Sequence, residues 1–389
     1  MAKKLSSLKK IDLTGTVRAR TATETLTAVR PLFPQFGITR VARVTGLDTI
    51  GIPTSICIRP NARHLATAQG KGLTQELADI SAIMESIEGY HAETVRAPTN
   101  YFSFREMTRK RLALDPRLLE RGPRWKIWNM ETPMRWVKGY ELIRRQTIWI
   151  PFIALTMDST APHPEFAILQ VSTNGLASGN NWVEAVLHAL YELVERDSEF
   201  RWSLLSARRR AATLVDPETI DTPFLRDLLT RLRIAKQLPL IWDITSRLGV
   251  PTFRCVLIDQ DAERNLGRFH GSGSHLVTSV ALSRALTEAA QARLTWISGS
   301  REDVFPYLYR DMQEKNQPAV ELPTPRLSIK NRQDAFSGLT LQDDLDWIVE
   351  KLRINGYPLI SVFSHTGDDL PISVVTVLVP GMSFSGNRI

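Results

Sequence analysis

One stretch, residues 180–196, constrains this chain more than any other. Placed at about 100° per residue, its apolar side chains fall on one broad arc, which predicts a helix packed by its back against a core. Glu184, Glu192 and Glu195 fall with His188 on the opposite side, within roughly 80° of one another. Carboxylates in a row raise each other's pKa unless a cation neutralises them. The alternative interpretation is a solvated helix face on which Glu184 closes a capping box.

Two further stretches place polar groups on one helical stripe. A helix predicted from about residue 74 to 95 carries Ser81, Glu85 and Glu88 at i, i+4 and i+7, within about 60°. A third helix, predicted from about residue 279 to 297, carries Arg284 and Glu288 at the same i, i+4 spacing. Paired glutamates on helices with apolar backs are difficult to accommodate without metal ions or arginine partners.

The chemistry that suits these stripes is a Mg²⁺–nucleotide site. Carboxylates bind hard cations, and Mg²⁺ takes a few protein oxygens while phosphates supply others. Arg196 and Arg284 would then meet phosphate oxygens as bidentate donors. The Walker spacing and the kinase signatures are absent, and the glycine-flanked Lys71 is by itself a weak phosphate signal.

The rest of the chain predicts a mixture of helices and short strands. Residues 1–17 are expected to form a loose tail. Polar segments that contain glycine are expected to be loops or turns at residues 69–72, 172–180 and 271–275. Further helices are expected at residues 23–33, 222–235 and 341–354, and strands at residues 38–44, 54–60, 147–155, 238–244, 252–258, 359–363 and 372–379.

Residues 97–165 are less regular and combine tryptophans with basic side chains. Prolines interrupt the pattern, and Trp125, Trp128 and Trp136 lie among Arg and Lys. Such tryptophans could stack nucleic-acid bases, but packing beneath a loop is the favoured interpretation.

Composition excludes several classes of protein. The chain has 43% apolar residues, enough for a large core, so it is not a disordered protein. A net charge of +8 is compatible with nucleic acid, a nucleotide or an acidic peptide, but the basic residues are scattered. Cys57 and Cys255 are too few for a disulfide framework and are expected to be buried free thiols. No apolar run reaches membrane-spanning length, so a cytoplasmic protein is expected.

Several motifs, in order along the chain, resemble those of the YcaO-domain family. They span residues from about 15 to 303 and are specific as a set: Gly37-Ile38-Thr39-Arg40-Val41-Ala42, Thr45-Gly46-Leu47-Asp48, Gln69-Gly70-Lys71-Gly72, Ser81 to Glu88, Asn174 to Asn180, Glu184 to Arg196, and Arg284 to Arg293. The resemblance implies one α+β domain over residues 18–389, with mixed or antiparallel sheets and helices packed around a central Mg²⁺–ATP site.

The resemblance also implies that ATP and Mg²⁺ are the cofactors. In this family a nucleophile adds to a peptide-backbone carbonyl, the oxyanion takes the γ-phosphoryl group of ATP, and phosphate then leaves. The product is an azoline, a thioamide or an amidine, and no covalent enzyme nucleophile is expected.

Carried over residue by residue, the resemblance implies three sets of site residues. The expected catalytic residues are Glu192, Glu195 and Arg196. The expected nucleotide contacts are Arg18, Thr25, Ser81, Asn180, Arg196, Arg284 and Glu288. The expected metal ligands are Glu85, Glu88, Glu184, Glu192 and Glu195.

Two departures from the family pattern bear on the product and the substrate. Many cyclodehydratases of the family end in a proline-rich tail, whereas residues 379–389 hold one proline, which resembles members encoded with a TfuA partner. Those members form thioamides. No leader-peptide-binding domain is recognisable, so a partner or residues 97–165 would capture the peptide. Thioamide formation in a precursor peptide, with a TfuA-like partner and a sulfur source, is the favoured hypothesis.

Two alternatives stay open. An azoline-forming cyclodehydratase that acts on Cys, Ser or Thr would use the same chemistry. A non-catalytic basic protein, bound to RNA or accessory to ribosomal-protein modification, would not need the glutamate stripes, and its binding would weaken steeply with salt. The favoured hypothesis includes neither nucleic acid nor a membrane as partner, and the family makes a homodimer the expected assembly.

Overall fold

The computed structural model describes residues 9–109, 111–160, 165, 168–260, 266–305, 307–309, 324–325 and 327–384. It confirms the α+β fold expected from the sequence. The strand pairs among the described residues are all antiparallel. The residues 385–389 that close the chain, including part of the stretch compared with the family's proline-rich tail, lie outside the described residues.

Three sheets each lead directly into one long helix. The first sheet is β3 (Arg40–Arg43), β4 (Thr54–Ile58) and β5 (Thr67–Lys71), followed by α3 (Gln75–Glu93). The second sheet has six strands. Five follow the order β6-β7-β13-β14-β9, and β8 pairs with β7. Their bounds are β6 (Asn100–Ser103), β7 (Pro133–Glu141), β8 (Gln146–Pro151), β9 (Leu176–Gly179), β13 (Ser361–Ser364) and β14 (Ser373–Leu378). Its β9 leads into α5 (Trp182–Ser203). The third is β10 (Gln237–Asp243), β11 (Thr252–Asp259) and β12 (Arg268–Ser274), followed by α8 (Thr278–Ser298).

The other elements are shorter and lie around these three units. The α-helices are α1 (Ala22–Val29), α2 (Phe33–Phe36), α4 (Phe104–Thr108), α6 (Ala207–Ala211), α7 (Pro223–Ile234) and α10 (Leu341–Ile354). Single 3-10 turns occur at Arg30–Leu32, Thr45–Leu47, Pro116–Leu118, Trp125–Ile127, Phe152–Ala154 and Pro217–Thr219.

Most of the glycine-bearing stretches expected to be loops or turns are strands instead, although residues 172–175 are a loop as expected. Residues 69–71, 176–179 and 271–274 belong to β5, β9 and β12. A Cβ at Gly70 would lie 2.0 Å from the backbone nitrogen of Ala82 on α3. A Cβ at Gly179 would lie 2.5 Å from that of Ala185 on α5. Gly70 and Gly179 therefore mark places where a strand runs directly against a helix, and not places where the chain turns.

The expected loose tail also differs from the structure over its described part. β1 (Ile11–Asp12) and β2 (Val17–Arg18) form a small hairpin, and Lys10 Nζ lies 2.7 Å from Asp344 Oδ1 on α10. Residues 9–17 are therefore attached to the body of the molecule, while residues 1–8 lie outside the described residues.

Each of the three long helices has its own apolar core at its back. The core behind α5 includes the apolar arc expected from the sequence: Val183, Val186, Leu187, Leu190, Leu193 and Val194. A second core lies between α8, α7 and the sheet of β10–β12, and a third lies between α3, α1 and β4. Trp136 is fully buried, so the packing interpretation holds for it. Cys57 and Cys255 are buried free thiols, as expected. Within the described part of the chain, no helix has the length and apolarity needed to cross a membrane.

Candidate functional site

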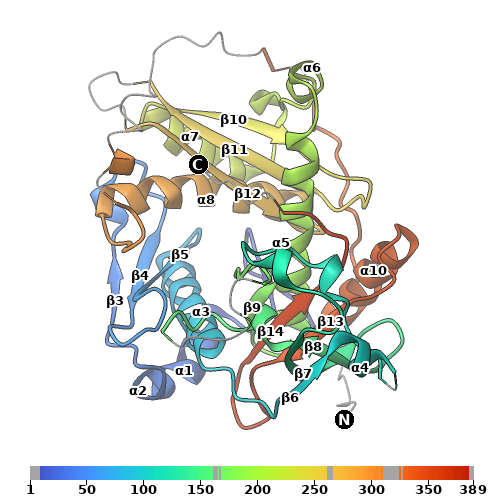
Figure 1. Ribbon diagram of the computed structural model, residues 1–389. Coiled ribbons are helices and arrows are strands. Elements are labelled where there is room, and N and C mark those ends of the chain that lie inside the picture. The colour runs from blue at the N-terminus through green and yellow to red at the C-terminus, as the bar shows by residue number, and fades with distance from the viewer. Residues whose placement is uncertain are drawn as a thin grey trace.

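The three long helices meet at the centre of the molecule, each with its sheet on the outer side (Figure 1). Each helix packs on the strand before it and on a strand of another unit: α3 also contacts β9, α5 contacts β12, and α8 contacts β5. The three units therefore close a ring. The helix faces predicted to be polar point into this ring, where their charges act on one another.

The second half of α5 carries an arginine held between glutamates. Arg196 Nη1 lies 3.0 Å from Glu195 Oε1 and 3.3 Å from Glu199 Oε2. Its Nη2 lies 3.8 Å from Glu192 Oε1. Burial raises the pKa of Glu195 to about 7, and Glu288 on α8 adds to this rise while Arg196 opposes it. Although burial acts in the other direction, these carboxylates raise the pKa of Arg196, so its guanidinium stays charged.

Glu88 on α3 faces β9. Its Oε1 accepts hydrogen bonds from the backbone N–H and the hydroxyl of Ser178, at 2.7 and 2.6 Å. Burial raises the pKa of Glu88 to about 8, and the charges of Glu85 and Glu192 add to the rise. Desolvation by the surrounding protein raises the pKa of Glu85 too, but the residue is exposed, so solvent screens this effect. These carboxylates lack full compensation by the protein's own cations.

The start of α5 is tied to the N-terminal segment. Glu184 is 2% exposed, and its Oε2 accepts the Ala19 N–H at 2.9 Å. Asn180 Nδ2 donates to Glu184 Oε1 at 3.2 Å, and the Thr25 hydroxyl donates to Asn180 Oδ1 at 2.8 Å. Arg18 Nε lies 3.9 Å from Glu184 Oε1. The structure thus brings four predicted site residues together, with Glu184 already engaged by donors of the protein.

The site residues predicted on α8 and on the first half of α3 are Arg284, Glu288 and Ser81, and they differ from one another in their contacts. Glu288 Oε2 lies 3.1 Å from Lys71 Nζ, which joins α8 to β5. Arg284 Nε is buried and has no hydrogen-bond partner among the described residues, and the same is true of Arg196 Nε. Ser81 is half-buried one turn before Glu85 and makes no hydrogen bond with its side chain in the described structure.

Two residues of the site were not among the predicted ones. In the sequence, the only indication for Lys71 was its flanking glycines, which are by themselves a weak sign of phosphate binding. Glu199 continues the stripe of α5 one turn beyond Glu195. It lies just past the stretch 180–196, so extending the predicted helix by one turn would have identified it. Its Oε1 lies 3.0 Å from Arg254 Nη1 on β11 and accepts the hydroxyl of Ser272 on β12. Glu199 therefore fixes the position of α5 on the third sheet.

The donor set fits a Mg²⁺–nucleotide complex better than a metal ion held by protein alone. Within the described ranges, no three His, Cys, Asp or Glu side chains lie close enough to hold a metal ion by themselves. Mg²⁺ usually takes one or two carboxylates and completes its shell with phosphates and water. Carboxylates with raised pKa values, beside the unpartnered Nε atoms of Arg196 and Arg284, suit a ligand that brings cations and phosphates together.

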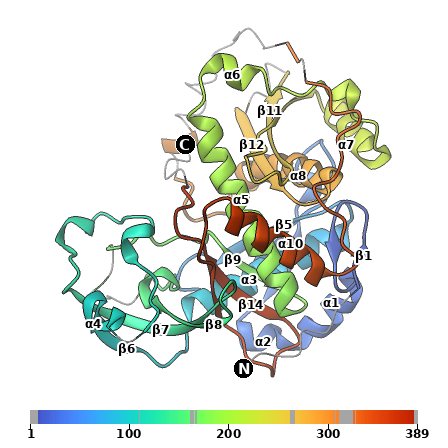
Figure 2. The same ribbon diagram turned by 90° about the vertical axis from the view of Figure 1, so that its right-hand side faces the viewer.

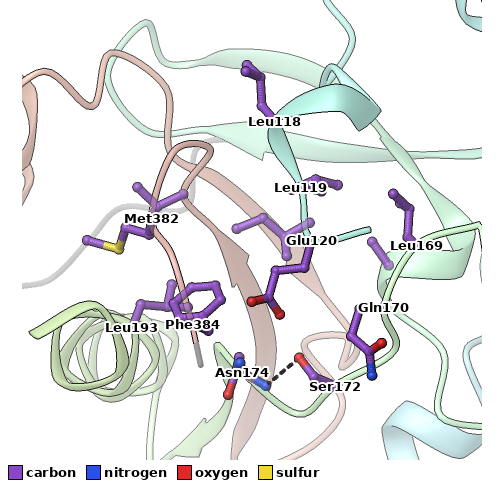
Figure 3. A pocket seen from close by; sticks show the side chains of 13 residues that line it. Leu118, Leu119, Glu120, Leu169, Gln170, Ser172, Asn174, Leu193, Met382 and Phe384 are labelled. Carbon is purple, nitrogen blue, oxygen red and sulfur yellow. Dashed lines mark hydrogen bonds between the residues drawn. The ribbon is translucent and has the colours of Figure 1, made fainter. Parts of the chain in front are cut away.

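A pocket lies on the flank of α5, beside this site (Figure 3). Its wall joins segments that are distant in sequence: Leu118, Leu119, Glu120, Ala154, Leu169, Gln170, Ser172, Asn174, Leu193, Leu378, Val379, Met382 and Phe384. Glu120 reaches into it, and burial raises the pKa of this carboxyl. The N–H of Gly175, next to the pocket residue Asn174, donates to Glu192 Oε2 at 3.3 Å. The pocket and the ring of helices therefore share a wall.

The chain is similar in sequence to a known family and to individual proteins. Residues 69–383 match the family model described as YcaO cyclodehydratase, ATP- and Mg²⁺-binding. The chain is 34% identical over 374 residues to a protein named for the tfuA 3′ region of Rhizobium leguminosarum bv. trifolii, covering 94% of this chain and 88% of that protein. It is 32% identical over 368 residues to an uncharacterized protein of Methanothermobacter thermautotrophicus, covering 92% of this chain and 93% of that protein.

Two solved structures have a similar fold. YcaO from Methanopyrus kandleri, bound with AMPPCP and Mg²⁺, matches with a TM-score of 0.73 at 24% identity, covering 96% of this chain and 94% of that chain. A heterocyclase in complex with substrate and cofactor matches with a TM-score of 0.79 at 20% identity, covering 98% of this chain and 54% of that chain. This chain therefore spans about half the length of the heterocyclase. At these identities the likeness shows the fold alone.

Proposed function

This chain belongs to the YcaO family of ATP-dependent peptide-modifying enzymes, whose cofactors are ATP and Mg²⁺, and we propose that it forms thioamides. In this proposal the enzyme activates a backbone amide of a ribosomally made peptide by phosphorylating its oxygen. A sulfur nucleophile, delivered with a TfuA-like partner, adds to the carbonyl carbon first. The resulting oxyanion takes the γ-phosphoryl group of ATP, and the oxygen then leaves with phosphate. The relative named for the tfuA 3′ region supports the choice of thioamide over azoline.

The residues inside the ring divide between metal and phosphate. Glu85, Glu88, Glu192 and Glu195 would share the Mg²⁺ ions, with Glu184 at the start of α5 as a further candidate. Arg196 and Arg284 would bind phosphate oxygens through their unpartnered Nε atoms. When bound, Mg²⁺–ATP supplies the phosphoryl group and neutralises charge that develops during its transfer.

The remaining predicted residues would position these groups. Thr25 and Asn180 hold Glu184 in place through a chain of hydrogen bonds, and Arg18 lies beside it. Ser81 and Glu288 would contact the nucleotide from α3 and α8. A buried cysteine is a poor nucleophile because only the thiolate reacts. Burial raises the pKa of both Cys57 and Cys255, which supports chemistry without a covalent enzyme intermediate.

One observation supports the Mg²⁺–ATP site of this proposal: carboxylates with raised pKa values and partly unpartnered arginines meet in one place from three separate helices. A structural ion-pair network would satisfy its members within the protein. Here a ligand that carries both metal and phosphate would neutralise the carboxylates and accept hydrogen bonds from the arginines.

Removal of a site carboxylate tests the assignment. In Glu192→Gln or Glu195→Gln, peptide-dependent phosphate release should fall by roughly 10²–10³-fold, because charge on the transferring phosphoryl group is no longer neutralised. The matched control is Glu218→Gln, whose carboxylate is 76% exposed and lies outside the ring. Undiminished phosphate release from either site variant, with unchanged folding by circular dichroism, would refute the site.

The product is decided by mass spectrometry of the peptide after reaction. Thioamide formation raises the mass by the difference between sulfur and oxygen and requires a sulfur donor. Loss of one water without a sulfur donor would instead support the azoline-forming alternative. If neither peptide-dependent phosphate release nor any change in the peptide's mass occurred across candidate peptides, the non-catalytic accessory role would be favoured.

A further inference from the structure

One end of the second sheet projects from the molecule away from the ring of helices. It consists of β6, β7 and β8, with α4 beside them (Figure 2). Phe102 on β6 pairs with Met134 on β7, and Trp149 on β8 pairs with Lys138 on β7. Side chains alternate between the faces of a sheet, and Met134 and Lys138 are four residues apart. Phe102, Lys138 and Trp149 therefore lie on the same face.

Two cations rest on the aromatic rings of this face. The guanidinium carbon of Arg111 lies 4.8 Å from the ring centroid of Trp149 and 5.4 Å from that of Phe102. Lys138 Nζ lies 5.6 Å from the centroid of Trp149. We refer to Phe102, Arg111, Trp149 and Lys138 as the cation–aromatic row. Ring contacts of this kind hold a cation in place without neutralising it.

The cations of the row are open to an incoming ligand. Arg111 and Lys138 are exposed, and the Phe102 ring remains 37% exposed. Some other cations of this segment are paired with carboxylates, as Arg117 is with Asp115. In the described structure neither Arg111 nor Lys138 forms an ion pair with a carboxylate. The row thus presents fixed positive charge beside an exposed apolar ring.

The surrounding segment concentrates the positive charge of the chain. Residues 97–165 hold twelve Lys and Arg against seven Asp and Glu, so they carry five of the eight net positive charges. Such a field attracts acidic partners over a distance of about one Debye length. Because the rings already restrict Arg111 and Lys138, less conformational entropy is lost when a carboxylate binds them.

We propose that the cation–aromatic row docks an acidic segment of the peptide substrate. Carboxylates of the peptide bind Arg111 and Lys138, and a neighbouring apolar side chain packs on Phe102. The same segment, 97–165, also supplies Leu118, Leu119 and Ala154 to the pocket on the flank of α5. This inference rests on the proposed function, because it takes a peptide to be the substrate.

The test measures binding without ATP, so it is independent of catalysis. A fluorescent glutamate-rich synthetic peptide is titrated with the full-length protein and followed by fluorescence anisotropy, next to its glutamine counterpart. In Arg111→Glu/Lys138→Glu the dissociation constant for the glutamate peptide should rise by roughly tenfold or more, since two attractions become repulsions. The matched control is Arg208→Glu/Arg209→Glu, which makes the same change of charge at exposed residues near the end of α5.

Three outcomes would overturn the proposal. They are equal weakening by both double variants, equal affinity for the glutamate and glutamine peptides, and loss of single-stranded RNA binding with unchanged affinity for the glutamate peptide. The neutral variant Arg111→Gln/Lys138→Gln should weaken binding to a smaller extent, which guards against a folding defect of the charge reversal. Failure of the proposed function would be recognised separately, because the unaltered protein would then show no nucleotide-dependent phosphate release.

Discussion

At the scale of single residues, His188 links α5 to β9 and to the N-terminal hairpin. It lies on α5 between Glu184 and Glu192, one turn from each. Its Nδ1 is 3.2 Å from the carbonyl oxygen of Ser178, and its Nε2 contacts Arg18 Nη1. Arginine can only donate, so Nε2 accepts and Nδ1 carries the proton that is donated to Ser178. Burial keeps the pKa of His188 well below its ordinary value, with the charge of Arg18 adding to this, so the ring stays neutral.

His188 is therefore expected to position Arg18 for the nucleotide. In His188→Asn the amide keeps a donor for Ser178 but loses the acceptor for Arg18, and the KM for ATP should rise by roughly tenfold. In His188→Gln the longer side chain places an oxygen near Nε2, and the KM for ATP should stay close to that of the unaltered enzyme. Steady-state phosphate release at saturating peptide measures both. An equal rise in the two variants would mean that His188 acts only through packing.

At the scale of elements, the strand glycines determine how close the helices come. Gly70, Gly179 and Gly271 each face the backbone of the helix that follows their strand. At Gly271 an added Cβ would lie 2.3 Å from Ala289 N and 2.6 Å from Glu288 Cβ. Backbone atoms cannot move aside as the end of a flexible side chain can. A larger residue would therefore push α8 outward and displace Glu288 with it.

Gly271→Ala should accordingly destabilise the protein by about 1–3 kcal/mol, the range of overpacking in a tightly packed core. The matched control is Gly46→Ala, because a Cβ at Gly46 would meet nothing within 4 Å. Urea denaturation of both variants measures the difference in free energy of unfolding. If the two variants proved equally stable, the close contact of β12 with α8 would have no energetic importance.

At the scale of the whole molecule, the ring gathers like charges from distant parts of the chain. The pKa of Glu195 is raised to about 7 and that of Glu88 to about 8, from an ordinary value of 4.5. A carboxyl with a raised pKa binds its proton more tightly in the folded protein than in the unfolded one. Its contribution to stability is therefore fully present below the unfolded value and is lost as the pH rises through the folded value.

The stabilising contribution of Glu88 and Glu195 should thus be lost between about pH 4.5 and pH 8, which lowers the melting temperature of the ligand-free protein over this range. The difference between the unaltered protein and Glu88→Gln/Glu195→Gln isolates that contribution, because glutamine does not titrate. At pH 8, Mg²⁺ with a non-hydrolysable ATP analogue at 100 times its Kd should stabilise the unaltered protein by about 2.7 kcal/mol. Parallel pH profiles for the two proteins, or no effect of the ligand, would contradict this account of the ring.

Much of the fold follows from local pattern. The apolar arc behind α5, the stripes of α3 and α8, and the helix α10 come from side-chain periodicity, which depends on neighbours one or two turns away. Two features did not follow. Residues 271–274 pair with β11 and their glycines pack against α8, and the hairpin at residues 11–18 lies next to Lys10, which contacts Asp344 on α10. Both depend on contacts between residues far apart in sequence.

The candidate site divides in the same way. By itself, the sequence determined which side chains share a helical stripe, because the α-helical repeat fixes that locally. Only the tertiary structure decided that the three stripes face one another, that Lys71 joins Glu288, and that Glu199 joins Arg254. The physical reason is that the strand glycines and the ring of units set the distances between helices, and the charges of the site depend on those distances.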